Sequence, residues 1–276
     1  MKKDSIFTGN LKLKEASNNP IYAGVGFRFG DRGTHTSRTM MFEELKVLLR
    51  ECPREATRSD YETAVIEDNC LQKKTLATRK LSQQRLSELY GLDSSVVLFR
   101  ILRLLWYGDE KGQPLLALLI TVSRDPLLRI TAPVIMEMGC GEELARQKMT
   151  DILRDGTHGR FNDNVLDKVV RNTASSWTQS GHLKGRGRKV RQLVQPTPAV
   201  TAYALLLGYI LGLRGDSLFS TLWSRLLDVT ADELRNLAVD AKRLGFLDLS
   251  QLGGVTEISF TRLLTEEERR LIHGTN

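Results

Sequence analysis

The sequence has few cysteines and histidines, with three and four respectively. Its three cysteines, Cys52, Cys70 and Cys140, are odd in number and far apart, and they form no CxxC or metal-ligand spacing. We expect small buried thiols in a reducing cytoplasm. The four histidines stand singly, and no phosphate loop, nucleophile elbow or zinc-binding helix motif occurs. The sequence therefore predicts a protein that is not an enzyme and that uses no metal or cofactor.

Long apolar runs are also missing. The nearest, residues 199–213, contains two glycines and ends at Arg214, which is typical of a buried helix and too short for a membrane span. Residues 1–10 carry lysines without an apolar segment after them, so we expect no secretory signal, a cytoplasmic location and no membrane partner. Acidic residues are in the minority, and the net charge is +7. This excess favours an anionic partner, most often nucleic acid.

Residues 1–36 are polar and rich in glycine. Glycines stand at positions 24, 26, 30 and 33, but no Gly-Lys-Ser/Thr follows them and the spacing is not GxGxxG. We therefore expect a flexible lead-in over residues 1–36 and not a nucleotide site.

Residues 37–140 have the periodicity of a helical core. Ser59 and Glu62 are spaced as a capping box, a hydroxyl cap precedes the first helix, and Gly91 is placed to end the third. Apolar residues recur at helical spacing in three short segments, 36–52, 59–68 and 76–91.

Basic residues cluster before and along the third of these helices. Three short helices with a basic third helix resemble a helix-turn-helix, although an exposed basic face is more often only solvated. The candidate DNA-binding residues here are Lys73, Lys74, Arg79, Lys80 and Arg85.

Two strongly apolar stretches follow, at residues 94–108 and 113–139. Their helices should form the central core. Pro126 and Pro133 interrupt the second stretch, which therefore predicts two helices.

A repeat links the two later parts of the chain. Residues 171–183, RNTASSWTQSGHL, match residues 235–247, RNLAVDAKRLGFL, at five of thirteen positions without a gap. In each copy a helix ends at glycine, Gly181 or Gly245, and passes into a segment with alternating residues around a glycine turn. A helix that runs directly into a two-stranded hairpin is typical of winged-helix domains. We therefore predict a mainly α fold, with a helical bundle followed by tandem winged-helix-like units at 141–196 and 197–276.

The tips of the two predicted hairpins differ in charge. The second, SQLGGVTE, is nearly neutral, which favours packing against protein. The first has five cations within eight residues and two glycines that allow close approach to phosphate: Lys184, Arg186, Arg188, Lys189 and Arg191.

The helix before the basic hairpin offers side chains suited to phosphate and base edges. Asp167 is expected at or before its start. The candidates are Lys168, Arg171, Ser176 and Gln179. The alternative is that the whole basic region is only a solvent-exposed surface that binds no nucleic acid.

Residues 61–90 resemble the BrxA family of bacterial BREX (bacteriophage exclusion) systems. The resemblance is carried by Ile66 to Asn69, Leu71 to Lys73, Thr75 to Lys80, and the Arg85-Leu86 pair. It is best over residues 30–125 and dilute after them. It implies a non-catalytic, mainly helical protein that binds double-stranded DNA and serves a phage-defence complex.

Several alternatives remain open at this point. Asn69, Gln72 and Thr75 of the family-like stretch suit a capping and turn network equally well. The protein could instead be an adaptor for other BREX proteins, such as a methyltransferase, an ATPase or a phosphatase-like protein. The helical core of the family has been likened to the NusB fold, which implies RNA as a third possible ligand.

Overall fold

The computed structural model describes residues 19–273, which form a mainly helical protein with two antiparallel hairpins. The elements are α2 (Pro20–Val25), η2 (Thr34–Thr36), α3 (Phe42–Glu51), α4 (Arg58–Ile66), α5 (Leu76–Tyr90), α6 (Val97–Trp106), α7 (Gln113–Arg124), α8 (Pro126–Glu137), α9 (Arg146–Gly156), α10 (Asp163–Gln179), β1 (Leu183–Lys184), β2 (Val190–Arg191), α11 (Pro198–Ile210), η3 (Gly215–Ser220), α12 (Leu222–Arg225), α13 (Ala231–Arg243), β3 (Asp248–Leu252), β4 (Val255–Ser259) and α14 (Glu266–His273).

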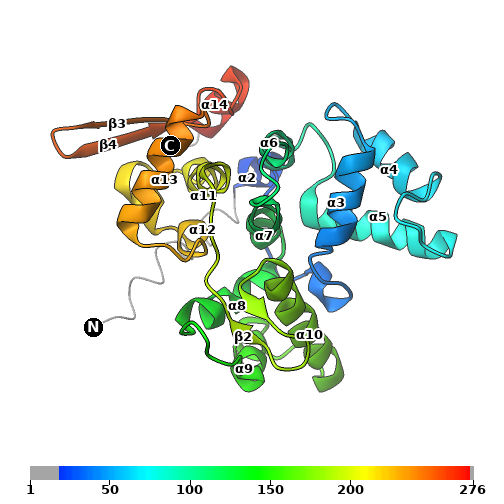
Figure 1. The fold of residues 1–276 in the computed structure, drawn as a ribbon. Coiled ribbons are helices and arrows are strands. Elements are labelled where there is room, and N and C mark those ends of the chain that lie inside the picture. Colours follow the sequence, from blue (N-terminus) through cyan, green and yellow to red (C-terminus); the bar gives the residue numbers. More distant parts are fainter. Residues whose placement is uncertain (1–18, 274–276) are drawn as a thin grey trace.

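Helix α7 lies at the centre of the molecule (Figure 1). Three groups of elements surround it: α3–α5, α8–α10 with the hairpin β1–β2, and α11–α14 with the hairpin β3–β4. Every residue from Leu115 to Arg124 is buried, as expected for a helix with neighbours on all sides. It packs against α5, α6, α8 and α11. One apolar core continues through all three groups, from Tyr22 to Ile272. The prediction that residues 94–108 and 113–139 form the central core is therefore confirmed.

The start of the described chain is packed, not loose. Val25 and Phe27 are buried, and Phe27 stacks edge-on against Trp223 at 5.9 Å between ring centroids. Thr34 and His35 are buried as well. The expected flexible lead-in is therefore wrong for residues 19–36, while residues 1–18 lie outside the described part of the chain.

Side-chain caps explain where several helices begin. Thr57 and Asp60 form the capping box of α4, so the expected Ser59–Glu62 box is wrong by two residues. Helix α3 starts after Met41 without the expected hydroxyl cap.

The turn before α5 is built by the family-like stretch. Thr75 caps α5, and Asn69 accepts a hydrogen bond from the backbone N–H of Lys73. Asn69 and Gln72 both adopt left-handed backbone conformations. The capping and turn network considered for Asn69, Gln72 and Thr75 is confirmed, and Gly91 ends α5 at φ 75° as predicted.

Proline and cysteine positions match the expectations in part. The apolar stretch 113–139 forms two helices, but only Pro126 starts a new one; Pro133 lies inside α8. Of the cysteines, Cys52 is buried, Cys70 is half-buried and Cys140 is exposed, so the expectation of buried thiols fails for Cys140.

The two repeated segments adopt the same order of elements. Helix α10 ends before Gly181, which has φ 89°, and leads into β1–β2; α13 ends before Gly245, which has φ 80°, and leads into β3–β4. In the first unit, Glu143 forms an isolated antiparallel bridge to Val190 of β2. The order of elements in both units is thus the one typical of winged helices.

A buried polar cluster joins the two units. His182 lies directly after α10, and its Nε2 is 2.9 Å from the carbonyl oxygen of Leu226 in the second unit. Its Nδ1 is 2.9 Å from Ser180 Oγ. Because the Leu226 oxygen only accepts, Nε2 carries the proton and the ring is satisfied in its neutral form. Burial lowers the pKa of His182 to about 4, against the opposing effect of Asp228.

This cluster predicts that stability falls in mild acid. The unfolded state takes up a proton on His182 near pH 6.5, whereas the folded state does so only near pH 4, so stability is lost as the pH falls through this window. We expect the free energy of unfolding of the parent to drop about 2 kcal/mol more between pH 7 and pH 5 than that of His182→Gln. Urea unfolding of both proteins at the two pH values measures this. Parallel losses in the two proteins would contradict it.

Candidate nucleic-acid interface

A groove of about 710 Å³ lies between α10, the loop that joins β1 to β2, and the residues that precede and start α9. We call it the hairpin groove. Its lining residues are Glu143, Leu144, Arg146, Val170, Arg171, Ala174, Ser175, Thr178, Gly185, Arg186, Gly187 and Lys189.

The lining of the groove combines an apolar contribution with a cationic one. Leu144, Val170 and Ala174 supply apolar groups. The charged members are Arg146, Arg171, Arg186 and Lys189 against the single acid Glu143, so positive charge prevails.

Glycine is required at one position of the hairpin loop. Gly185 has φ +116°, and a Cβ added there would meet the backbone oxygen of Arg188 at 1.9 Å. Gly187 has open space where its Cβ would be. Gly185 therefore shapes the loop, while Gly187 leaves its backbone accessible to a ligand.

The cations of the basic hairpin, Leu183–Arg191, have different surroundings. Lys184 and Arg186 are exposed, and within residues 19–273 no carboxylate forms an ion pair with either. Arg188 is 75% exposed, and its Nε lies 2.6 Å from Glu143 Oε2. Lys189 is half-buried; its Nζ donates to Thr178 Oγ1 at 2.7 Å, and burial lowers its pKa. Lys189 thereby holds the loop over α10.

Arg191 was expected at the DNA surface, and this is wrong. Its side chain is 2% exposed and paired with Asp228 of the second unit. Its Nε donates to the carbonyl oxygen of Ile135 at 3.0 Å, and its other guanidinium nitrogens donate to Gln192 and Asp228. Arg191 therefore fastens the base of the hairpin and is not available to a ligand.

Two residues of helix α10 that were expected to contact DNA form hydrogen bonds inside the protein instead. Ser176 is fully buried, and its Oγ accepts a hydrogen bond from the backbone N–H of Met40 at 2.8 Å. Gln179 accepts from the N–H of Phe42 and donates to Thr39 Oγ1. Both are removed from the candidate interface.

Two of the α10 candidates do remain at the surface, Lys168 and Arg171. Arg171 pairs with Asp167 at 3.2 Å, and Asp167 also pairs with Arg146. Asn162, not Asp167, caps the helix.

A buried Ser–His–Asp arrangement that the sequence did not indicate lies where η2 and the start of α8 meet α10. His35 Nε2 lies 2.8 Å from Ser176 Oγ, and His35 Nδ1 lies 3.0 Å from Asp125 Oδ2. Burial alone would raise the pKa of Asp125, but His35 and backbone N–H donors outweigh it and lower that pKa. All three side chains are buried, and Ser176 also accepts from Met40. The arrangement fixes η2 and residue 40 against α10; no signal in the sequence brings residues so far apart together.

The N-terminal candidates are less free than the sequence suggests. Lys73 pairs with Glu44 at 3.1 Å, and Arg85 pairs with Glu88 at 2.7 Å. Arg79 donates to the carbonyl oxygen of Ile66 at the end of α4, so it holds the turn between α4 and α5. Of the five candidates in this region, Lys74 and Lys80 are exposed.

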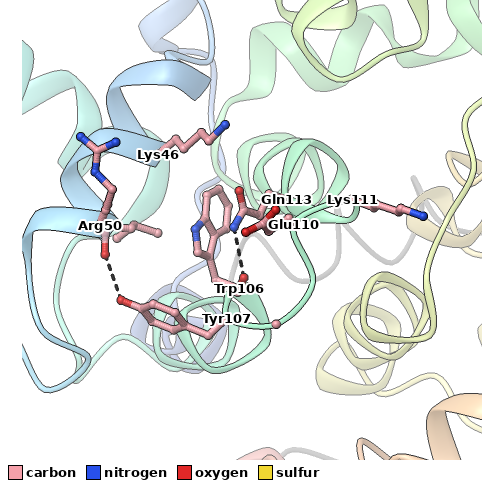
Figure 2. A pocket seen from close by; sticks show the side chains of 9 residues that line it. Lys46, Arg50, Trp106, Tyr107, Glu110, Lys111 and Gln113 are labelled. Carbon is pink, nitrogen blue, oxygen red and sulfur yellow. Dashed lines mark hydrogen bonds between the residues drawn. The ribbon is translucent and has the colours of Figure 1, made fainter.

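A second pocket, of about 500 Å³, lies where α3, α6 and the start of α7 meet (Figure 2). Tyr107 donates to the carbonyl oxygen of Leu49, and Gln113 to that of Trp106. Arg50 and Lys111 extend away from Trp106 on opposite sides, and Arg50 pairs with Glu51. The pocket is therefore a weaker candidate for an anion than the hairpin groove.

Comparison with protein-family models and with curated proteins finds no match to this chain. None of the helices in residues 19–273 is both long and apolar enough to cross a membrane. No group of three or more metal-ligating side chains comes together in the same residues.

The burial of Arg191 predicts a contrast within one hairpin. Arg191→Ala leaves Asp228 without its buried partner and should lower the free energy of unfolding by about 3–5 kcal/mol. Arg186→Ala removes an exposed side chain of the same type and should change it by no more than about 0.5 kcal/mol. Urea unfolding of the two variants checks this. Equal, small effects would show that Arg191 is not a buried clamp.

Proposed function

We propose that the protein is a non-catalytic accessory protein of a BREX phage-defence system, located in the cytoplasm, which binds double-stranded DNA. The hairpin groove and the tip of the basic hairpin make the contact. The observation that carries this proposal is the exposed group Lys184, Arg186 and Arg188 beside the cationic groove of α10. The biological setting rests on the resemblance of residues 61–90 to the BrxA family.

The proposed contact is mainly to phosphate. Lysine and arginine neutralise phosphates and release counterions regardless of sequence. Ser176 and Gln179, which could read base edges, are engaged inside the protein. Binding is therefore expected to be strongly salt-dependent and only weakly sequence-specific.

The first test removes the cations of the tip. Lys184, Arg186 and Arg188 replaced together by alanine should weaken binding to a 20-base-pair duplex about tenfold or more at moderate salt, because several phosphate contacts are lost. Fluorescence anisotropy across a salt series measures both the affinity and its salt slope, which should become shallower.

A matched control removes the same charge elsewhere. Lys242, Arg243 and Arg270, all exposed in the second unit, are replaced by alanine. If both triple variants bind the duplex as the parent does, the tip is not the contact. Competition with structured RNA separates a DNA-binding from an RNA-binding protein.

A second candidate function, an adaptor for other BREX proteins, is favoured by one observation. The hairpin β3–β4 extends from the body of the molecule (Figure 1). Two apolar side chains at its tip are exposed. Leu252 is 84% exposed and Val255 is 69% exposed. From Asp248 to Ser259 there is no lysine or arginine, so this tip is suited to a protein surface and not to a polyanion.

The adaptor role predicts a separation of activities. Leu252→Ser combined with Val255→Thr should abolish co-purification with the methyltransferase, ATPase or phosphatase-like protein and leave duplex binding unchanged, because only apolar contact area is lost. Leu104→Ser, which alters an exposed leucine of α6, is the control. Unchanged co-purification by the double variant would rule out this tip as the docking site.

A further inference from the structure

Two carboxylates pair with three arginines at or beside the hairpin groove in the free protein. Glu143 Oε2 lies 2.6 Å from Arg188 Nε, and residue 143 forms an isolated bridge to Val190 of β2. Asp167, on the exposed side of α10, pairs with Arg171 at 3.2 Å and also with Arg146. Three guanidinium groups at or beside the groove are therefore engaged by two acids.

We propose that Glu143 and Asp167 act as affinity-setting latches, which hold these arginines in the free protein and compete with phosphate for them. The proposal deepens, and rests on, the binding of DNA at this groove. Binding of a phosphate chain releases Arg188 from Glu143, and Arg146 and Arg171 from Asp167.

The geometry of the pairs suits release. Both carboxylates and all three guanidinium groups are at least half exposed, so water solvates the separated charges and the exchange is readily reversible. The contrast is Arg191, whose buried pair with Asp228 is not open to exchange.

The latches should also favour long polyanions. A single small phosphate replaces one carboxylate at one arginine and gains little. A duplex replaces both carboxylates at once and releases condensed counterions from several phosphates. Once bound, an unneutralised carboxylate beside phosphate still repels it, so each acid lowers the affinity that the cations alone would give.

The test neutralises the acids without changing their shape. Glu143→Gln and Asp167→Asn should each tighten binding to a 20-base-pair duplex about three- to tenfold at low salt, and the double variant should tighten it further. Thermal unfolding should stay close to that of the parent, because exposed ion pairs contribute little to stability.

The matched control is Asp240→Asn. Asp240 pairs with Arg243 at 2.8 Å on α13 and is about as exposed as Glu143, so the variant gains the same net charge away from the groove. If Glu143→Gln and Asp167→Asn bind the duplex no more tightly than Asp240→Asn does, the latch proposal is overturned.

Heparin retention separates the latch from the proposed function. If the latch variants elute from immobilised heparin at higher salt than Asp240→Asn while no variant binds duplex DNA, the latch is supported and DNA is the wrong polyanion. If neither heparin nor DNA distinguishes the latch variants from Asp240→Asn, the latch fails whatever the parent binds.

Discussion

The buried guanidinium of Arg191 is the constraint on which the candidate interface depends. It joins the end of α8, the base of the basic hairpin and the loop before α13, through Ile135, Gln192 and Asp228. A buried cation needs a full set of acceptors and a counter-charge, and arginine can bind several groups at once in fixed directions. With its base held in this way, the hairpin can present only its loop to solvent. Lys184, Arg186 and Arg188 lie at the surface because Arg191 is buried and holds the base of the hairpin.

Strand geometry explains why five similar cations have different roles. Leu183 pairs with Arg191 in the β1–β2 register, and both are buried. Lys184, the next residue of β1, is exposed. Alternation is visible in the sequence, but which face is inside is not, since Val190 and Val194 suggest one answer and Leu183 the other. Asp228, which decides it, comes 37 residues later.

Local signals in the sequence predicted much of the fold. Helical periodicity, the glycine stops at positions 91, 181 and 245, and the repeat gave helices and hairpins close to where they lie. Boundaries that depend on one cap were less accurate, as at α4, because several hydroxyl residues near the helix start could cap it.

The candidate site was only half predictable for a different reason. The exposed tip residues are a local feature, but Ser176 and Gln179 have polar partners in residues 35–42, more than 130 positions earlier. Polar side chains on a helix look equally available in the sequence whether they face solvent or a distant segment. Residues 19–36 were expected to be flexible for the same reason, because the partners that hold Thr34 and His35 are also distant in the sequence.

The internal use of Ser176 and Gln179 has a consequence for what the first unit can recognise. These bonds fasten η2 and the start of α3 to the C-terminal half of α10, and Lys189 closes the loop over Thr178 on the same helix. The C-terminal half of α10 is thus committed to the fold. The exposed polar residues of the helix lie further toward its N-terminal end, at Asp163, Asn164, Asp167, Lys168 and Arg171. Lys168 and Arg171 can reach phosphates, whereas Ser176 and Gln179 are not available to base edges. The second unit has the same order of elements but an apolar tip, so the chain uses one architecture for two different surfaces. The side chains at the tip of each hairpin and the exposed side chains of the helix before it determine the chemistry of each surface. The fold that the two units share does not determine it.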